Sequence, residues 1–165
     1  MQISAIEQEV SDINWFAVDC EGHLATLSSA GGRIPPSAAS SVEDNTLLVS
    51  FFRSLAVDSE EFLIDAAFQQ AWADAQHPVI LQHPVMHRIS FEPYAYYSVR
   101  GLFTFRRNET DTKGLWSDSE YSLVTKPPKP LSYAELPQHI QEIIGKTTYA
   151  AAFSTSPLLN LRAVS

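Results

Sequence analysis

Hydrophobic and polar positions first predict a β-hairpin near the start of the chain. Residues 15–19 are apolar on both faces apart from the last, which is typical of a buried strand. The following turn at 20–23 contains Gly22, a residue that readily adopts a positive φ. A second apolar run at 24–27 completes the predicted hairpin.

Two helices are predicted next. Between positions 47 and 55, apolar residues recur at intervals that place them on one helix face. The second helix is expected to begin at Asp58, whose carboxylate can cap free backbone N–H groups, with Glu61 as its capping-box partner. Its expected buried positions are Ile64, Phe68, Ala71, Trp72 and Ala75.

The middle of the chain predicts an irregular segment followed by two paired strands. Three prolines punctuate residues 77–93, where we expect a crossing segment with a short edge strand at 79–81. Strict alternation of side chains predicts a strand over 96–106. Residues 121–126 are expected to pair with it antiparallel.

The last part of the chain predicts a short helix and a final strand. Ser132 and Glu135 form a second capping box before a helix at 136–144, and Gly145 ends it. Residues 149–153 are the last expected strand. Because strands and helices do not alternate regularly, the order favours an α+β fold over a doubly wound sheet. We expect one domain, 1–165, with an antiparallel sheet of about four to five strands and two central helices plus the short C-terminal helix on one face.

Charge narrows the classes of partner. The chain has 165 residues and a net charge of −8. Residues 1–80 hold twelve acidic residues against two arginines, whereas residues 81–165 hold nine basic and seven acidic residues. An acidic first half repels phosphate backbones, which excludes a general nucleic-acid binder, and it favours a basic protein partner.

The single cysteine, Cys20, excludes an internal disulfide and a multi-thiolate metal site. The opening residues lack the basic start and apolar run of a secretory signal, and no stretch approaches the roughly 18 consecutive apolar residues of a membrane span. We therefore expect a cytoplasmic protein with no membrane contact.

Candidate catalytic and metal-binding groups do not form a recognisable motif. Cys20 and His23 lie across the predicted turn, but Asp19 and Glu21 flank the sulfur, and negative charge suppresses a thiolate. The same turn supplies too few oxygen ligands for a calcium loop. His77, His83 and His87 are close in sequence, but an extended chain holds them too far apart for one ion. We expect no catalytic residue, no metal and no cofactor.

A binding surface is the remaining candidate. Acidic residues on the second helix can pair with Arg and Lys of a partner, which adds association rate and specificity. Tyrosine and arginine at the start of the long strand belong to the residue types enriched at binding hot spots. The candidate partner-binding residues are Asp58, Glu60, Glu61, Asp65, Tyr96 and Arg100.

Several stretches resemble a known class of proteins. Residues 14–25 (Asn-Trp-Phe-Ala-Val-Asp-Cys-Glu-Gly-His-Leu-Ala), followed by a serine/glycine loop and Ile34-Pro35, resemble the opening of small bacterial proteins of unknown function. Residues 100–105, 127–136 and 153–159 are similar in kind. In size and acidity, proteins with such openings resemble the immunity proteins of polymorphic toxins. The resemblance implies a non-catalytic protein that masks a toxin's active site, and it carries over no functional residue.

The leading hypothesis is therefore a non-catalytic protein that neutralises a basic toxin. One alternative is a small-molecule or metal-dependent site, a cryptic enzyme, that uses His23, His77 or His83 in a cleft between helices and sheet. Another is an accessory domain of a larger assembly. The sequence does not determine the oligomeric state.

Overall fold

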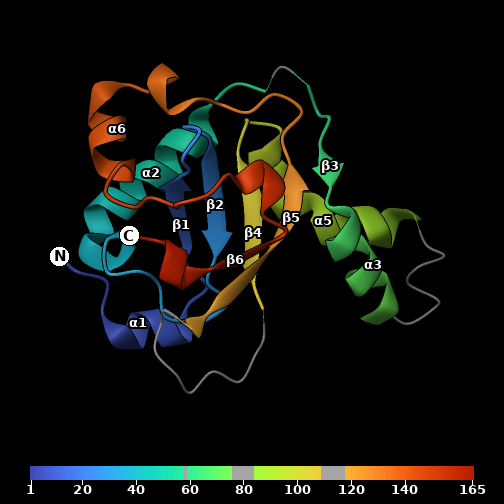
Figure 1. Cartoon of the computed structure of the whole chain (residues 1–165), viewed down its shortest axis with the longest axis horizontal. Helices are drawn as coiled ribbons and strands as arrows, with labels where there is room; N and C mark the ends of the chain where they lie inside the picture. Colours follow the sequence, from blue (N-terminus) through green and yellow to red (C-terminus); the bar gives the residue numbers. More distant parts are fainter. Residues whose placement is uncertain (58, 76–83, 109–117) are drawn as a thin grey trace.

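A sheet with helices on one face forms the centre of the protein in the computed structural model, which describes residues 1–57, 59–75, 84–108 and 118–165 (Figure 1). The helices are α1 (Ala5–Val10), α2 (Val42–Ser54), α3 (Ala66–Ala75), α5 (Pro84–Ser98) and α6 (Gln138–Ile144). The strands are β1 (Asn14–Val18), β2 (Leu24–Ser28), β3 (Leu63–Ile64), β4 (Phe103–Arg107), β5 (Glu120–Lys126) and β6 (Leu158–Asn160). The α+β class predicted from the sequence is confirmed.

Within the described residues the sheet has six strands and is mixed, because one of its pairs is parallel, where an antiparallel sheet of about four to five strands was expected. Its strand order is β1-β2-β4-β5-β3, and β6 also pairs with β5. The predicted hairpin is confirmed by antiparallel pairing of β1 with β2, and β5 returns antiparallel to β4 as expected. Strands β2 and β4 run parallel, since the chain between them crosses over through α2, α3 and α5.

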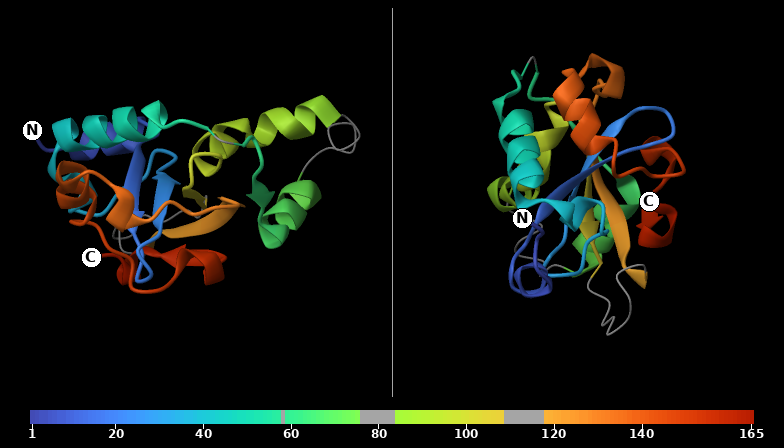
Figure 2. Two further views of the ribbon diagram at one scale, coloured as in Figure 1. Left: turned by 90° about the horizontal axis from the view of Figure 1, so that it is seen from above. Right: turned by 90° about the vertical axis from the view of Figure 1, so that its left-hand side faces the viewer.

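Alternate side chains of the strands serve two separate cores. On one face Phe16 packs with Phe52 of α2 and Ile140 of α6. On the other face Trp15 and Phe105 pack with Phe153 and the C-terminal segment. Figure 2 shows α2 and α5 on one side of the sheet and the C-terminal segment on the opposite side. The nearly unbroken apolar run of β1 follows from burial on both faces.

The second predicted helix begins later than expected. Residues 59–62 are not helical, β3 pairs with the end of β5, and α3 starts only at Ala66. Asp58 lies outside the described residues, and Asp65 accepts a hydrogen bond from the Phe68 backbone N–H at the start of α3. The expected buried face is wrong, because none of the residues of α3 is buried and Ala71 and Ala75 are exposed. Instead of packing centrally, α3 lies near β5 and contacts α5, where Phe68 and Trp72 meet Phe91.

The strand predicted over 96–106 is correct only for its second half. Helix α5 continues through Ser98 with Pro93 inside it, and the strand begins at Phe103. The turn between them contains Gly101 with a φ of +94°. The expected edge strand at 79–81 lies outside the described residues. The prediction of irregular structure over 77–93 is wrong for residues 84–93, which belong to α5.

The C-terminal predictions are partly confirmed. Ser132 and Glu135 form the predicted capping box, although it opens a short 3-10 helix at Tyr133–Glu135 ahead of α6. Gly145 caps the end of α6 as expected. The last strand is wrong, because Phe153–Thr155 is a 3-10 helix and β6 comes later. Burying Phe153 in the second core, rather than pairing its backbone, explains this difference.

Tyr121 in the second core gives a prediction about pH. Burial raises its pKa to about 12, and its ring meets Trp15 edge-on. Since an unfolded tyrosine titrates near pH 10, stability from the neutral phenol is complete below that pH and is lost as the pH rises through 12. A tyrosinate absorbance titration should therefore show a late phase that Tyr121→Phe removes. An unchanged titration in this variant would contradict the assignment.

Candidate functional site

An apolar pocket opens between α5 and the segment that leads into α3. Its volume is about 570 Å³. One side comes from Phe91 and Ala95 of α5 and from Val99 just beyond its end, which follow one another at i, i+4 spacing. The other side comes from Val57, Phe62 and Ile64. We call this the arm pocket, because α3 and part of α5 extend beyond the edge of the sheet as an arm (Figure 1 and Figure 2).

Two predicted binding residues meet at this pocket in a fixed arrangement. The guanidinium of Arg100 lies 3.8 Å from the centre of the Tyr96 ring. The same guanidinium donates to the Tyr96 carbonyl at 2.7 Å and, through Nε, to the Leu55 carbonyl at 3.2 Å. The Tyr96 hydroxyl in turn donates to the Arg53 carbonyl. Tyr96 is 38% exposed, so a large aromatic surface is held in place and open to a partner.

The three predicted acidic residues that the structure describes, Glu60, Glu61 and Asp65, do not share one face. Glu60 lines the arm pocket together with Glu92. Glu61 lies instead in a neighbouring groove of about 410 Å³ that also contains Arg100 and Lys129. Asp65 is buried, and its carboxylate lies 3.3 Å from the Lys126 ammonium. Asp65 therefore holds α3 to the sheet and is not an accessible contact.

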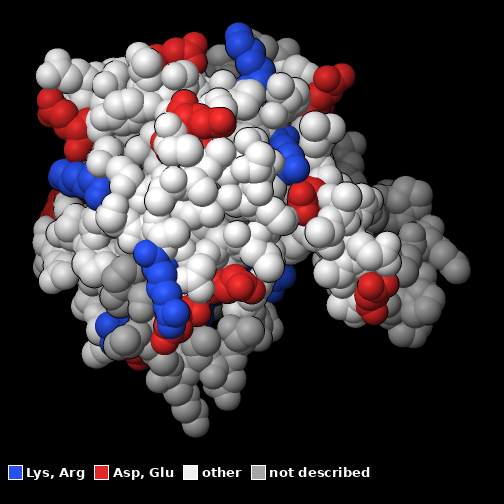
Figure 3. Space-filling view, in the orientation of Figure 1, with Lys and Arg blue, Asp and Glu red and all other residues white. Residues whose placement is uncertain are grey.

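Acidic residues elsewhere are distributed over several elements, and many have a local partner. Glu9 pairs with Arg33, and Asp44 pairs with Lys146. Asp12 accepts from the Ser28 hydroxyl. Acidic and basic side chains are interspersed on the face shown in Figure 3. The expected acidic surface is thus reduced to local groups, of which Glu60 and Glu92 lie next to apolar surface.

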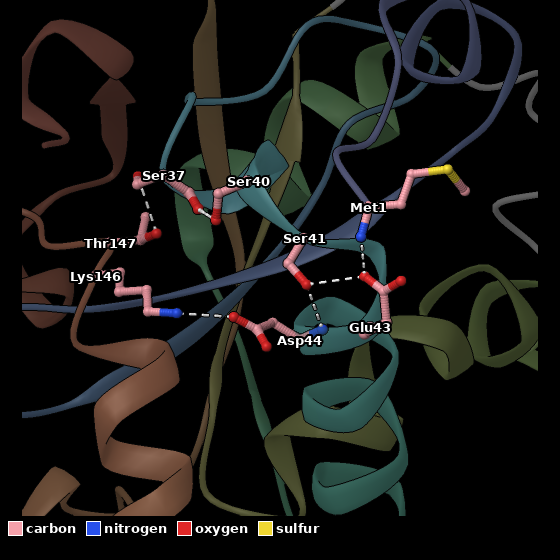
Figure 4. Close-up of polar contacts among 8 residues, drawn as sticks. All are labelled: Met1, Ser37, Ser40, Ser41, Glu43, Asp44, Lys146 and Thr147. Carbon is pink, nitrogen blue, oxygen red and sulfur yellow. Dashed lines mark hydrogen bonds and ion pairs between the residues drawn. The ribbon is translucent and has the colours of Figure 1, made fainter.

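A hydroxyl-rich cluster joins α2 to the end of α6 (Figure 4). Lys146 donates to Asp44 at 2.8 Å, and the Thr147 hydroxyl donates to Ser37 at 3.0 Å. Ser41 caps α2 by accepting from the Asp44 N–H. The cavity beside these groups has a volume of only about 20 Å³. The polar groups of the cluster form hydrogen bonds and an ion pair with one another, so the cluster stabilises the packing of α2 against the end of α6.

The turn between β1 and β2 brings Asp19, Glu21 and His23 together, with their ligand atoms within 4.8 Å of one another. Both oxygens of Asp19 are already used, one by the N–H groups of Glu21 and His23 and the other by the N–H of Phe153. The sequence did not predict this role of Asp19. The three side chains lie close together because the Asp19 carboxylate stabilises this turn. Cys20, which is also in the turn, is exposed.

A second cleft, between α5 and the sheet, lies where the histidine hypothesis places a site. Its volume is about 410 Å³. Its lining contains no histidine among the described residues. His23 lies in the β1–β2 turn, and the predicted positions His77 and His83 lie outside the described residues. We call this the polar cleft.

Comparison with known proteins adds no relative: no family model, curated protein or solved structure matches the chain. None of the helices in the described ranges combines the length and apolar character needed to cross a membrane.

Several lining residues of the arm pocket were not predicted. Phe91, Ala95 and Val99 have the spacing of a helix face, and this spacing is visible in the sequence. Pro93 and the alternation that starts at Tyr97 favoured extended structure over it. Phe62 gave no signal, because it was placed inside a helix that begins four residues later.

Proposed function

We propose that this protein is a non-catalytic binding protein that engages a basic protein partner through the arm pocket, in the manner of a toxin immunity protein. The observation that carries the proposal is an open apolar pocket of about 570 Å³ on an acidic part of the chain. Exposed apolar patches with polar edges are typical of protein interaction sites.

The residues of the pocket match the anatomy of an interface. An apolar centre can bury one or two side chains of a partner, while tyrosine and arginine at its edge supply rigid contact area. The Arg100 guanidinium, which donates to the Leu55 carbonyl, stacks on the Tyr96 ring, and the Arg53 carbonyl accepts from the Tyr96 hydroxyl. Because these contacts fix the position of Tyr96, little side-chain entropy is lost on binding.

The charge of the arm supports a basic partner. From 57 to 100 the sequence holds six acidic residues and two arginines. Glu60 and Glu92 lie at the pocket itself. Opposite charges around an apolar centre accelerate association and select against acidic partners. The proposal includes a cytoplasmic location, which the exposed single thiol of Cys20 supports.

Ala95→Arg tests the proposal by placing bulk and positive charge in the pocket. Ala67→Arg is the matched control, because Ala67 is exposed on α3 and does not line the pocket. A partner is first captured on the wild-type protein and identified by mass spectrometry, and its affinity for each variant is then measured by calorimetry. We expect Ala95→Arg to weaken binding at least about a hundredfold and Ala67→Arg to leave it nearly unchanged.

The immunity role makes a further demand on the same partner. It should be basic, toxic when expressed alone, and harmless when expressed with the wild-type protein but not with Ala95→Arg. An acidic partner, or equal affinity of both arginine variants, would contradict the proposal.

A further inference from the structure

The floor of the polar cleft is an unusual surface for a sheet that a helix covers. In the strand register Thr26 lies opposite Phe16 on one side and Thr104 on the other. The next row with side chains on the same face joins Asn14, Ser28 and Arg106. Directly opposite residues share one face of a sheet, so polar side chains dominate the part of the floor beneath α5.

Two buried hydroxyls in this cleft lack a partner. Thr26 and Tyr97 are each 4% exposed, and neither hydroxyl has a partner in full hydrogen-bond geometry among the described residues, although the Arg53 guanidinium lies near enough to the Tyr97 hydroxyl to oppose the rise in its pKa. Both residues line the cleft. The nearby Thr104 hydroxyl differs, because it is satisfied by Thr125. Buried polar atoms are nearly always hydrogen-bonded in native proteins, so an unpartnered pair facing one cavity indicates a ligand.

Three charged groups of the described residues line the cleft: the Arg53 guanidinium, the Asp12 carboxylate, which accepts from the Ser28 hydroxyl and the Ala30 N–H, and the Glu92 carboxylate, which has a partner of its own. Arg53 at the end of α2 lines the cavity, and its guanidinium forms no ion pair with any described residue. Burial raises the pKa of Tyr97, with the charge of Arg53 as the largest opposing influence. The Tyr97 hydroxyl therefore remains protonated at neutral pH and is a donor, as is the guanidinium.

We infer that the polar cleft binds a small molecule through a carboxylate or phosphate group, held by Arg53, Tyr97 and Thr26. An oxyanion accepts several hydrogen bonds at once and pairs with a guanidinium in planar geometry. It satisfies both orphaned hydroxyls and the cation together. The volume of about 410 Å³ accommodates a small organic molecule beyond the anionic group. This site is separate from the arm pocket, because it lies on another side of α5 and shares only Glu92 and Tyr96 with it.

Removing the two hydroxyls tests the inference without disrupting the fold. Thr26→Val and Tyr97→Phe each delete a buried group that has no protein partner, so stability should be unchanged or increased. Thr46→Val is a matched control, because Thr46 is exposed and does not line the cleft. The probes are inorganic phosphate and acetate, titrated at constant ionic strength with chloride as the reference anion.

Binding is followed by the NMR shifts of backbone amides at positions 26, 53 and 97. The wild-type protein and Thr46→Val should show saturable shifts with phosphate, acetate or both, with a dissociation constant on the order of 1 mM. Thr26→Val and Tyr97→Phe should each weaken this binding about tenfold. Saturation by phosphate alone identifies a phosphorylated ligand, and saturation by acetate alone identifies a carboxylate. Linear shifts with both probes, or equal binding by all variants, would overturn the inference in favour of a cleft filled by water.

Discussion

Asp19→Ala is expected to destabilise the protein by about 4 kcal/mol. Asp19 is buried, with no exposed area on its side chain, and its carboxylate accepts three backbone N–H groups, from Glu21, His23 and Phe153, at 2.8–2.9 Å. Alanine leaves all three donors without this acceptor. Each unpaired buried donor costs roughly 1–3 kcal/mol, and those that reach water cost less. The loss also frees Phe153, which closes the core on the C-terminal side of the sheet.

The measurement is the free energy of unfolding from urea titration. Glu21→Ala is the control, because Glu21 is the exposed acidic neighbour in the same turn, and we expect it to change stability by less than about 0.5 kcal/mol. Asp19→Asn should lie between the two, since its amide oxygen still accepts but its NH₂ group cannot accept the third N–H. A loss below about 1 kcal/mol in Asp19→Ala would refute this account of the turn.

Gly101→Ala should be the second most damaging substitution, at about 3 kcal/mol. The φ of Gly101 is +94°, a conformation that side chains with a Cβ rarely adopt. An added Cβ would also lie 2.8 Å from both the backbone N and the Cβ of Leu131. The turn cannot move away freely, because the Gly101 carbonyl accepts the Leu131 N–H.

Gly22→Ala separates the two causes. Gly22 also has a positive φ, +78°, but the nearest atom to an added Cβ is 3.9 Å away. It should therefore cost only the backbone strain, about 1 kcal/mol. Since Gly101 follows Arg100 directly, Gly101→Ala should also reduce partner binding at the arm pocket. Equal urea midpoints for the two alanine variants would show that the clash with Leu131 is relieved.

The elements that the sequence predicted correctly are those whose pattern depends on residues close together in the chain. The hairpin of β1 and β2, the apolar face of α2 and the capping box at Ser132 each depend on residues close together in sequence. The strand predicted over 96–106 failed for a different reason. Tyr97 and Phe103 fit one alternating pattern. Tyr97, however, lies on helix α5 and is buried against Phe16, whereas Phe103 lies on strand β4. Only packing distinguishes these two ways of burying an aromatic ring.

The candidate sites depend on contacts between distant segments. Residue type predicts Tyr96 and Arg100 as binding residues, and the structure brings them together because Arg100 lies in the turn that directly follows α5, four residues after Tyr96. Asp65 was singled out for its charge, but its position beside Lys126 makes it structural. Thr26 and Tyr97 carry no signal in the sequence as a pair, since β2 and α5 meet only in the folded chain.

The sequence alone determined the α+β class, the hairpin, the excess of acidic residues and the absence of a recognisable catalytic motif, because composition and local periodicity fix these properties. Tertiary structure decided the parallel pairing of β2 with β4, the helical state of residues 96–98, and which acidic groups remain accessible. The physical reason is that burial and hydrogen-bond satisfaction depend on partners remote in the chain, and the arm pocket and the polar cleft exist only where such partners meet.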